Sequence, residues 1–244
     1  KASRKDLRNA VTAARKAAEG WAKRTAYNRG QILYRMAEML EGKSEEAAHL
    51  LAATVPGGLR RARKEVAMSC DRLVSYAGWT DKYVQVLGNA NPVAGPFYNF
   101  TIPEPTGVVG VVAPDEEPLL ALVTLLAAPL SAGNAVVALG SSAYPLLTSL
   151  MGEVCATSDV PAGVINLLTG DRGELLEVFA NYRDVNAIHA AGCSSEERRI
   201  LELGAAINLK RVRVRETVGK AWYDDVQCTS PYWIEGFVEM KTIW

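Results

Sequence analysis

Strands and helices alternate through the second half of this chain, and this alternation limits its possible folds more than any other feature. After Pro105, runs that are apolar throughout are each followed by a helical segment of about 10–15 residues. Strands that are apolar on both faces must be covered on both faces, as in a parallel sheet between layers of helices. The sequence therefore predicts an α/β fold with an open, mostly parallel sheet. The expected strands are 107–113, 134–139, 163–169, 185–190 and 211–216, and the expected helices are 118–132, 144–157, 174–181 and 194–205.

The first 85 or so residues have the periodicity of amphipathic helices. Pro56, Gly57 and Gly58 separate two such segments from a third, more charged one. Between residues 86 and 105, glycine, proline and asparagine interrupt short apolar runs, which predicts a hairpin or an extended excursion. The apolar faces are formed by Leu7, Val11, Ala14, Ala18 and Trp21 in the first segment, and by Ile32, Met36, Met39 and Leu40 in the second.

The composition suits one large domain, or one domain with a small appendage. Of 244 residues, 49% are hydrophobic, and 27 lysines and arginines balance 27 aspartates and glutamates. No basic face is therefore indicated for nucleic acid. The longest apolar run, residues 119–130, is interrupted by Thr124 and Pro129 and predicts a buried helix, not a membrane span. No signal peptide is recognisable, and Lys1 in place of methionine suggests a piece of a longer chain.

Four cysteines lie far apart in the sequence: Cys70, Cys155, Cys193 and Cys228. They form no C-x-x-C pair and no set with a nearby histidine, so we expect neither a disulfide framework nor a metal site. Reduced thiols are typical of a cytoplasmic protein, which is the localisation that we expect.

Several short segments resemble, in the same order, segments of the aldehyde dehydrogenases. Each match is weak alone, but their common order and matching intervals imply the Rossmann-like cofactor domain of that family. The segments, with the family's wording, are Tyr76–Lys82 (YAGWADK), Glu104–Gly110 (EPxGVVG), Leu130–Val137 (LAAGNTVV), Pro161–Asn166 (PPGVxN), Asp184-Val185 (PDV) and Phe237–Trp244 (YTEVKTV, the closing strand).

The resemblance also implies that a large part of the family's structure is missing. Family members carry a catalytic domain before the closing strand, whereas about ten residues separate Lys220 from Ser230 here. This truncation is similar to the second, non-catalytic unit of the two-unit aldehyde dehydrogenases (family sixteen). We therefore expect a Rossmann-like cofactor-type domain over 1–85 and 106–225, and a small β element made of a bridging hairpin at 86–105 and a returning terminal strand within 226–244.

No residue replaces the family's catalytic nucleophile. Aldehyde oxidation needs a thiolate, which the family supplies from a GQxC loop that has no counterpart in this sequence. Cys228, within QCTS, is either a reactive thiol or an ordinary surface or linker cysteine, and we favour the second interpretation. The family's oxyanion asparagine, in PWNFP, aligns with Glu116, whose carboxylate offers only acceptors. Acids at 115–117 instead suit the dipole of the next helix, which Asp115 can cap.

The ribose-binding KPSE segment of the family becomes Leu139–Ser142. Leucine cannot donate a hydrogen bond to a ribose hydroxyl, and the glutamate acceptor is lost, so that only Ser141 survives. A serine in this position is also an ordinary turn residue.

The family's FTGS segment, after a later strand, becomes Ala190–Cys193. Gly192 would let a phosphate approach the next helix N-terminus, but Ser194 and Glu197 form a capping-box pattern that occupies the same amides. Cys193 is better interpreted as a packed side chain than as a nucleophile. Ser141, Gly192 and Cys193 are thus vestigial cofactor-binding candidates, and we expect NAD(P) binding to be weak or lost.

Glu216 is the one candidate acid or base, because Glu216–Lys220 resembles the family's ELGGK with its register shifted by about one residue. Without a nucleophile it has no proton to manage, so we interpret it as a charged strand end. His49, among alanines on a helix, and His189, in an apolar strand, have no partner that the sequence reveals.

The leading hypothesis is a non-catalytic aldehyde dehydrogenase-like unit of a larger NAD(P)-dependent enzyme, with a structural role. Its expected partners are an upstream catalytic unit, a second copy that pairs through the hairpin and terminal strand, or both, because an open sheet edge calls for a cover. The alternative is a degenerate dinucleotide- or adenylate-binding sensor, motivated by Ser141, Gly192 and the sheet's carboxyl edge. A working dehydrogenase would require a nucleophile that we do not find.

Overall fold

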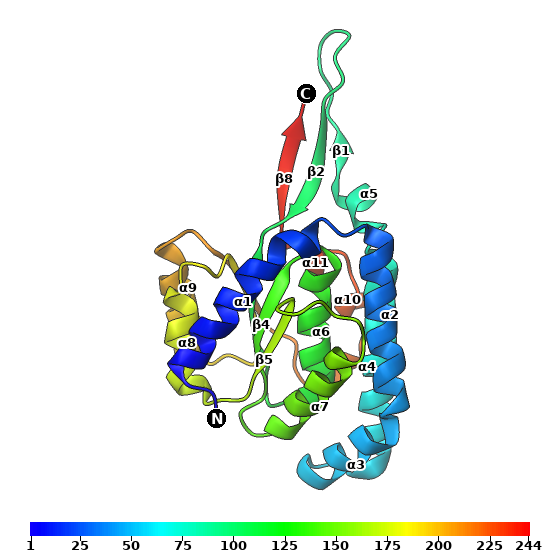
Figure 1. The fold of residues 1–244 in the computed structure, drawn as a ribbon, viewed down its shortest axis with the longest axis vertical. Coiled ribbons are helices and arrows are strands. Elements are labelled where there is room, and N and C mark those ends of the chain that lie inside the picture. Colours follow the sequence, from blue (N-terminus) through cyan, green and yellow to red (C-terminus); the bar gives the residue numbers. More distant parts are fainter.

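A five-stranded parallel sheet forms the centre of the molecule (Figure 1), whose computed structural model describes residues 1–244. The strand order is β5-β4-β3-β6-β7, so the chain builds outward from β3 on one side and then on the other. Each predicted strand overlaps an observed one, and the expected parallel α/β sheet is confirmed. The strands are β3 (Val108–Val112), β4 (Ala135–Leu139), β5 (Ile165–Leu168), β6 (Ala187–Ala191) and β7 (Arg211–Arg215).

Helices cover both faces of this sheet, which explains why its strands are apolar throughout. Alternate residues of β3 serve the two layers: Val109 and Val111 pack with the larger core cluster, and Val108 and Val112 pack with the smaller. The smaller cluster lies under α1 (Arg4–Ala22), α8 (Arg172–Asn181) and α9 (Ser195–Ala206). The larger lies under α2 (Ala26–Gly42), α3 (Ser44–Thr54), α4 (Gly58–Trp79), α6 (Pro118–Ser131) and α7 (Pro145–Ala156).

Helix α6 is the centre of the larger cluster, and every one of its residues is buried. It occupies the position where the sequence predicted a buried helix, and it packs against α4. No helix of the structure combines the length and the apolar character that a membrane crossing needs.

A three-stranded antiparallel sheet projects from the body as an arm (Figure 1). Its order is β1-β2-β8, so the terminal strand lies beside the hairpin, with Phe100 opposite Ile243 and Pro105 opposite Val238. Only β2 pairs with β8, whose other edge has no partner in the chain. The arm consists of β1 (Asn89–Ala90), β2 (Phe100–Pro105) and β8 (Val238–Ile243), and the short helix α5 (Tyr83–Leu87) leads into it.

The segment between β7 and β8, residues 216–237, lies against the body, and we call it the strap. It contains the 3₁₀ turn η1 (Gly219–Tyr223) and the short helices α10 (Asp225–Cys228) and α11 (Tyr232–Glu235). Residues 226–235, which the sequence grouped with the terminal strand, therefore belong to the packing of the body. The reason is their apolar content, because the strap completes the larger core cluster with Trp222, Cys228, Trp233, Ile234 and Phe237.

Candidate functional site

The carboxyl ends of the parallel strands meet at one edge of the sheet, where ligands of such folds usually bind. The loops after β4 and β6 carry the residues that the sequence selected as cofactor candidates, and the loop after β3 carries Glu116, at the oxyanion position. Gly192 turns with a left-handed φ of 59°, and a Cβ there would lie 2.7 Å from the Cβ of Pro114. A side chain at this position would therefore collide with Pro114, because the β6 loop packs on the β3 loop.

Ser141 is bound within the protein. Its Oγ donates to Asp115 Oδ1 at 2.5 Å and accepts from the backbone N–H of Tyr144 at 3.0 Å. Asp115 Oδ1 also accepts from the N–H of Ala143 at 3.1 Å. The prediction that Asp115 caps the following helix is therefore wrong, because its carboxylate turns toward the β4 loop and satisfies donors there.

Helix α6 receives its cap from a distant residue instead. Glu65 of α4 is fully buried, and its Oε1 accepts from the N–H groups of Leu119 and Leu120 at 2.9 and 3.3 Å. Glu117, just before the helix, has a left-handed φ of 45° and makes no capping bond. Its carboxylate contacts Arg61 at 2.9 Å and accepts a 2.6 Å hydrogen bond from the Tyr223 hydroxyl of the strap.

The N-terminus of α9 is also occupied by the chain's own groups. Ser194 and Glu197 form the predicted capping box, with Glu197 Oε2 accepting from the N–H of Ser194 at 2.7 Å. Arg172 Nε lies 2.9 Å from Glu197 Oε1, and its Nη2 lies 2.9 Å from the Cys193 sulfur. A carboxylate and its arginine thus stand where the resemblance places a pyrophosphate.

Burial disfavours the thiolate form of all four cysteines. Burial raises the pKa of Cys70 and of Cys155 to about 12, and burial is also the main cause of the raised pKa values of Cys193 and Cys228. Cys228 is not the surface or linker cysteine that we favoured: it is buried, and its thiol donates to the carbonyl of Ala221 at 3.4 Å. The strap turns it inward because its neighbours cover the core.

The remaining candidate acid, Glu216, and His49 are exposed to solvent, whereas His189 is buried. Glu216 follows β7 with its side chain 84% exposed and pairs with Arg198 at 3.1 Å. His189 is buried: Arg215 Nε donates to its Nε2 at 3.0 Å, so its Nδ1 donates to the Leu125 carbonyl. Burial and the Arg215 charge lower its pKa, so it stays neutral. His49 is exposed, 3.8 Å from Glu45.

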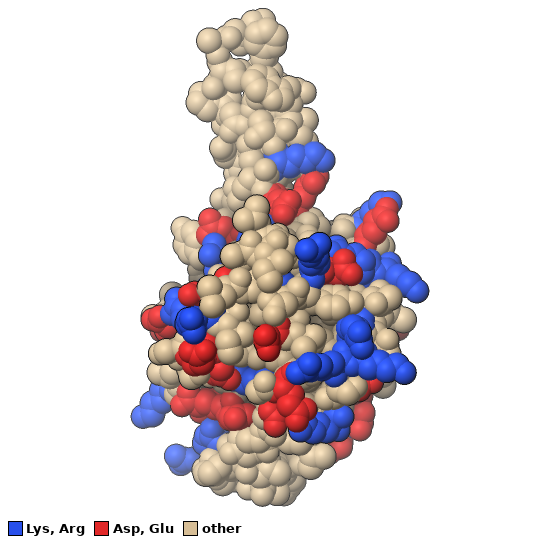
Figure 2. All heavy atoms as spheres, turned by 90° about the vertical axis from the view of Figure 1, so that its left-hand side faces the viewer, with Lys and Arg blue, Asp and Glu red and all other residues tan.

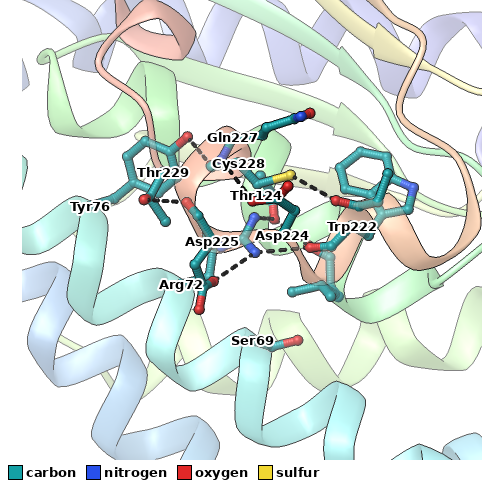
Figure 3. A network of polar contacts seen from close by, with 12 residues as sticks. Ser69, Arg72, Tyr76, Thr124, Trp222, Asp224, Asp225, Gln227, Cys228 and Thr229 are labelled. Atoms are coloured by element: carbon teal, nitrogen blue, oxygen red, sulfur yellow. Dashed lines mark hydrogen bonds and ion pairs between the residues drawn. The ribbon is translucent and has the colours of Figure 1, made fainter.

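A buried arginine on α4 anchors the strap (Figure 3). Arg72 has no exposed surface; its Nη1 donates to Thr124 Oγ1 of α6 at 3.1 Å. Its Nη2 donates to the Trp222 carbonyl at 2.9 Å and lies 3.2 Å from Asp225 Oδ1. One guanidinium therefore joins α4, α6 and the strap.

Two further residues on the same face of α4 donate to the strap. The Tyr76 hydroxyl donates to the carbonyl of Cys228 at 2.8 Å, and Trp79 Nε1 donates to that of Thr229 at 2.7 Å. Residues 72, 76 and 79 share a face because they are spaced by four and three positions. This set was not predicted from the sequence, although an arginine among apolar residues of a helical face was an available signal.

An open cavity of about 460 Å³ lies at the carboxyl ends of β4 and β5. Lys1 at its rim lies 2.8 Å from Glu174 and 3.7 Å from Asp171. Its lining is mostly polar and includes Ser142, Pro145, Ser149, Thr169 and Asp171. No three His, Cys, Asp or Glu side chains are grouped so as to hold a metal ion.

The sheet order and the parallel strands covered by helices on both faces define an α/β unit of the kind that forms cofactor domains. Residues 1–222 match the model of the aldehyde dehydrogenase family. The chain therefore belongs to the aldehyde dehydrogenase family, as the resemblance indicated.

Curated relatives extend far beyond this chain. It is 34% identical over 223 residues to the cytosolic 10-formyltetrahydrofolate dehydrogenase of Pongo abelii, which covers 88% of the chain and 24% of that protein. It is 30% identical over 221 residues to the putative aldehyde dehydrogenase DhaS of Bacillus subtilis, covering 88% of the chain and 43% of that protein. The chain thus spans about a quarter to two fifths of the length of these relatives.

Solved structures agree with the fold. An aldehyde dehydrogenase from Bacillus cereus in complex with NAD+ matches with a TM-score of 0.83 and 27% identity, covering 90% of this chain and 44% of that one. A putative aldehyde dehydrogenase from Burkholderia cenocepacia matches with a TM-score of 0.82 and 31% identity, covering 89% and 43%. The matched part is the α/β domain, and more than half of each neighbour has no counterpart here.

Replacing Arg72 should release the strap. Arg72→Met leaves the Trp222 carbonyl without its partner in the core, and we expect a loss of about 2–3 kcal/mol in the free energy of unfolding. The control is Arg63→Met on the same helix, which removes an exposed ion pair with Glu45 of α3. It should lower the free energy of unfolding by less than about 1 kcal/mol. Urea denaturation followed by circular dichroism measures both. Equal losses in the two variants would contradict the anchor.

Proposed function

We propose that this chain is a non-catalytic unit of a larger NAD(P)-dependent aldehyde dehydrogenase, in which it has a structural role in assembly. The observation that carries the proposal is the strap. The segment that stands where family members carry a catalytic domain is short and packs its apolar side chains into the core of the body. The body is therefore closed over a surface that a catalytic domain would otherwise meet.

The absence of catalysis is supported by the state of the candidate groups. Oxidation of an aldehyde by this family's chemistry needs a thiolate and a donor for the oxyanion. All four thiols have raised pKa values. Glu116, at the oxyanion position, is exposed and its carboxylate offers only acceptors, and Glu216 is paired with Arg198 in solvent.

The residues at the sheet's carboxyl edge do not fit the dinucleotide that the family implies. Asp115 and Glu197 take up the donors of the β4 loop and the α9 N-terminus, and both would repel phosphate or fail to donate to ribose. Leu139 is buried in the smaller core cluster, so it offers no polar group. We therefore propose that NAD(P) binding by this unit is weak or lost.

The arm supports an assembly role. The free edge of β8 exposes backbone hydrogen-bonding groups that a second strand can pair with. On the face that Figure 2 shows, the outer part of the arm carries no lysine, arginine, aspartate or glutamate. Its exposed side chains include Phe97, Tyr98 and Trp244, which are 69%, 74% and 87% exposed. The proposed partners are an upstream catalytic unit of the parent polypeptide, a second copy, or both.

The purified chain should not oxidise simple aldehydes. With acetaldehyde and either NAD or NADP at neutral pH, we expect the cofactor to be reduced no faster than in the absence of protein. The absorbance of the reduced cofactor measures this rate. An aldehyde-dependent rate that disappears in Cys228→Ala or Cys193→Ala would overturn the non-catalytic assignment, because these variants remove the thiol of the strap and the thiol of the β6 loop.

A charge on the free strand should weaken assembly. Met240, on β8, is 48% exposed, and Met240→Lys places a cation on an edge that a partner strand would cover. We expect the association to weaken by at least roughly tenfold, which corresponds to about 1.4 kcal/mol. Light scattering measures it for the chain alone and for the chain mixed with the catalytic unit of its parent. Val226→Lys, on an exposed part of the strap, is the control. If wild type associates with neither itself nor that unit, the assembly role fails.

The sensor alternative is favoured by one observation, the cavity of about 460 Å³ beside β4 and β5. Calorimetric titration with NAD, NADP and AMP tests it, and we expect no heat and no shift of the thermal midpoint at millimolar ligand. Saturable binding that is lost in Ser149→Trp, which fills the cavity, would favour the sensor over the structural role.

A further inference from the structure

Two carboxyl groups and a tyrosine meet where the strap crosses the start of α6. Glu65 comes from α4, Glu117 from the loop before α6, and Tyr223 from η1 of the strap. Glu117 Oε2 accepts from the Tyr223 hydroxyl at 2.6 Å, which ties the strap to the loop. This cluster is separate from the Arg72 anchor and from the sheet's carboxyl-edge candidates.

The two carboxyl groups differ in their freedom to move. Glu65 is fully buried on a long helix and is held by the two amides of α6, while its Oε2 is buried without a hydrogen-bond partner. Glu117 lies in a loop with a left-handed φ of 45°, a conformation that a non-glycine residue adopts at some cost in energy. When the pair is disturbed, Glu117 is therefore the residue that moves.

Only one cation forms ion pairs with the two carboxyl groups, so two ionised carboxylates at this place would leave an excess of negative charge. Arg61 of α4 lies 2.9 Å from Glu117 and 3.9 Å from Glu65. Lys64 stands over the Tyr223 ring, 4.6 Å from its centre. The loop before α6 carries two further charged residues next to Glu117, Asp115 and Glu116, and both are exposed. The remaining strap charges next to Tyr223 in sequence are Lys220, Asp224 and Asp225.

One proton on the pair relieves this excess of negative charge. Burial, followed by the charge of Glu117, raises the pKa of Glu65 to about 7, against the opposing effects of the amides and Arg61. Burial and the bond to Glu117 raise the pKa of Tyr223 as well, so its hydroxyl remains a donor. Near neutral pH, Glu65 is thus the group that gains or loses the proton.

We propose that Glu65, Glu117 and Tyr223 form a proton-dependent latch that holds η1 of the strap closed while Glu65 carries a proton and loosens it when that proton leaves. Loss of the proton leaves two buried negative charges with one arginine between them. Glu117 then turns outward, its bond to Tyr223 breaks, and η1 lifts from the start of α6. The Arg72 anchor keeps the rest of the strap in place.

The sign of the pH dependence follows from the raised pKa of Glu65. Opening lets water reach Glu65, so its pKa in the open form returns toward the ordinary value of 4.5. Between that value and about 7 the closed form holds one more proton than the open form, so each rise of one pH unit favours opening up to about tenfold. Above about 7 both forms are ionised and the effect levels off.

Hydrogen–deuterium exchange of the full chain, read by mass spectrometry, tests the latch. After correction for the intrinsic pH dependence of exchange, peptides covering residues 219–224 should lose about twentyfold in protection between pH 5.5 and 7.5. Peptides covering β6 serve as the internal reference and should not change. A constant protection of 219–224 over this range in the wild-type chain would overturn the proposal without any variant.

Matched variants separate the latch from a general effect of pH. Glu65→Gln keeps an acceptor for the α6 amides but cannot ionise, so protection of 219–224 should no longer vary with pH. Glu45→Gln, an exposed carboxyl that pairs with α4, should keep the wild-type response. If Glu65→Gln does not fold, Glu117→Gln is used instead. It removes the charge that helps to raise the pKa of Glu65, so the pH above which protection stops falling should move below 7. If the protection of 219–224 in Glu65→Gln or in Glu117→Gln varies with pH as it does in the wild-type chain, the mechanism is refuted.

Discussion

The rest of the structure depends on one buried guanidinium. Arg72 draws α4, α6 and the strap together through Thr124, the Trp222 carbonyl and Asp225. A buried charge is costly unless it is fully engaged, so this contact requires the strap to lie where it does. With the strap in place, its tryptophans and Phe237 complete the larger core cluster. The unit thereby has a closed core although it covers less than half of its solved relatives.

The chain uses its own carboxylates at positions where the family resemblance implies ligands. Asp115 binds the β4 loop, Glu197 caps α9, and Glu65 caps α6. Backbone amides left bare in a protein interior are costly, and internal acceptors remove that cost without a bound molecule. That internal carboxylates take the place of a bound ligand supports the proposal of a structural unit rather than an enzyme. It also places a titratable carboxyl, Glu65, beneath the strap.

Prediction from sequence worked best for patterns that repeat within one element. The sheet strands and α6 were correctly located because they are apolar on both faces or throughout. The capping box of α9 was also correct, since its two residues are three positions apart. The predicted cap of α6 was wrong, because the residue that caps it, Glu65, lies 54 residues from Leu119, whereas the sequence pattern pointed to the adjacent Asp115. The burial of Cys228 was missed for the same kind of reason, as its environment is supplied by α4 and α6.

By itself, the sequence determined the α/β class, the family and the lack of the family's nucleophile loop, because each is written in a local pattern or in the order of short segments. Tertiary structure alone decided that the strap covers the body, that Arg72 anchors it, and that Glu65, Glu117 and Tyr223 meet. These contacts join residues about 100–150 positions apart, as between Tyr223 and Glu117 or Arg72 and Trp222. Such pairings depend on how whole elements pack, and no periodicity in a single segment encodes them.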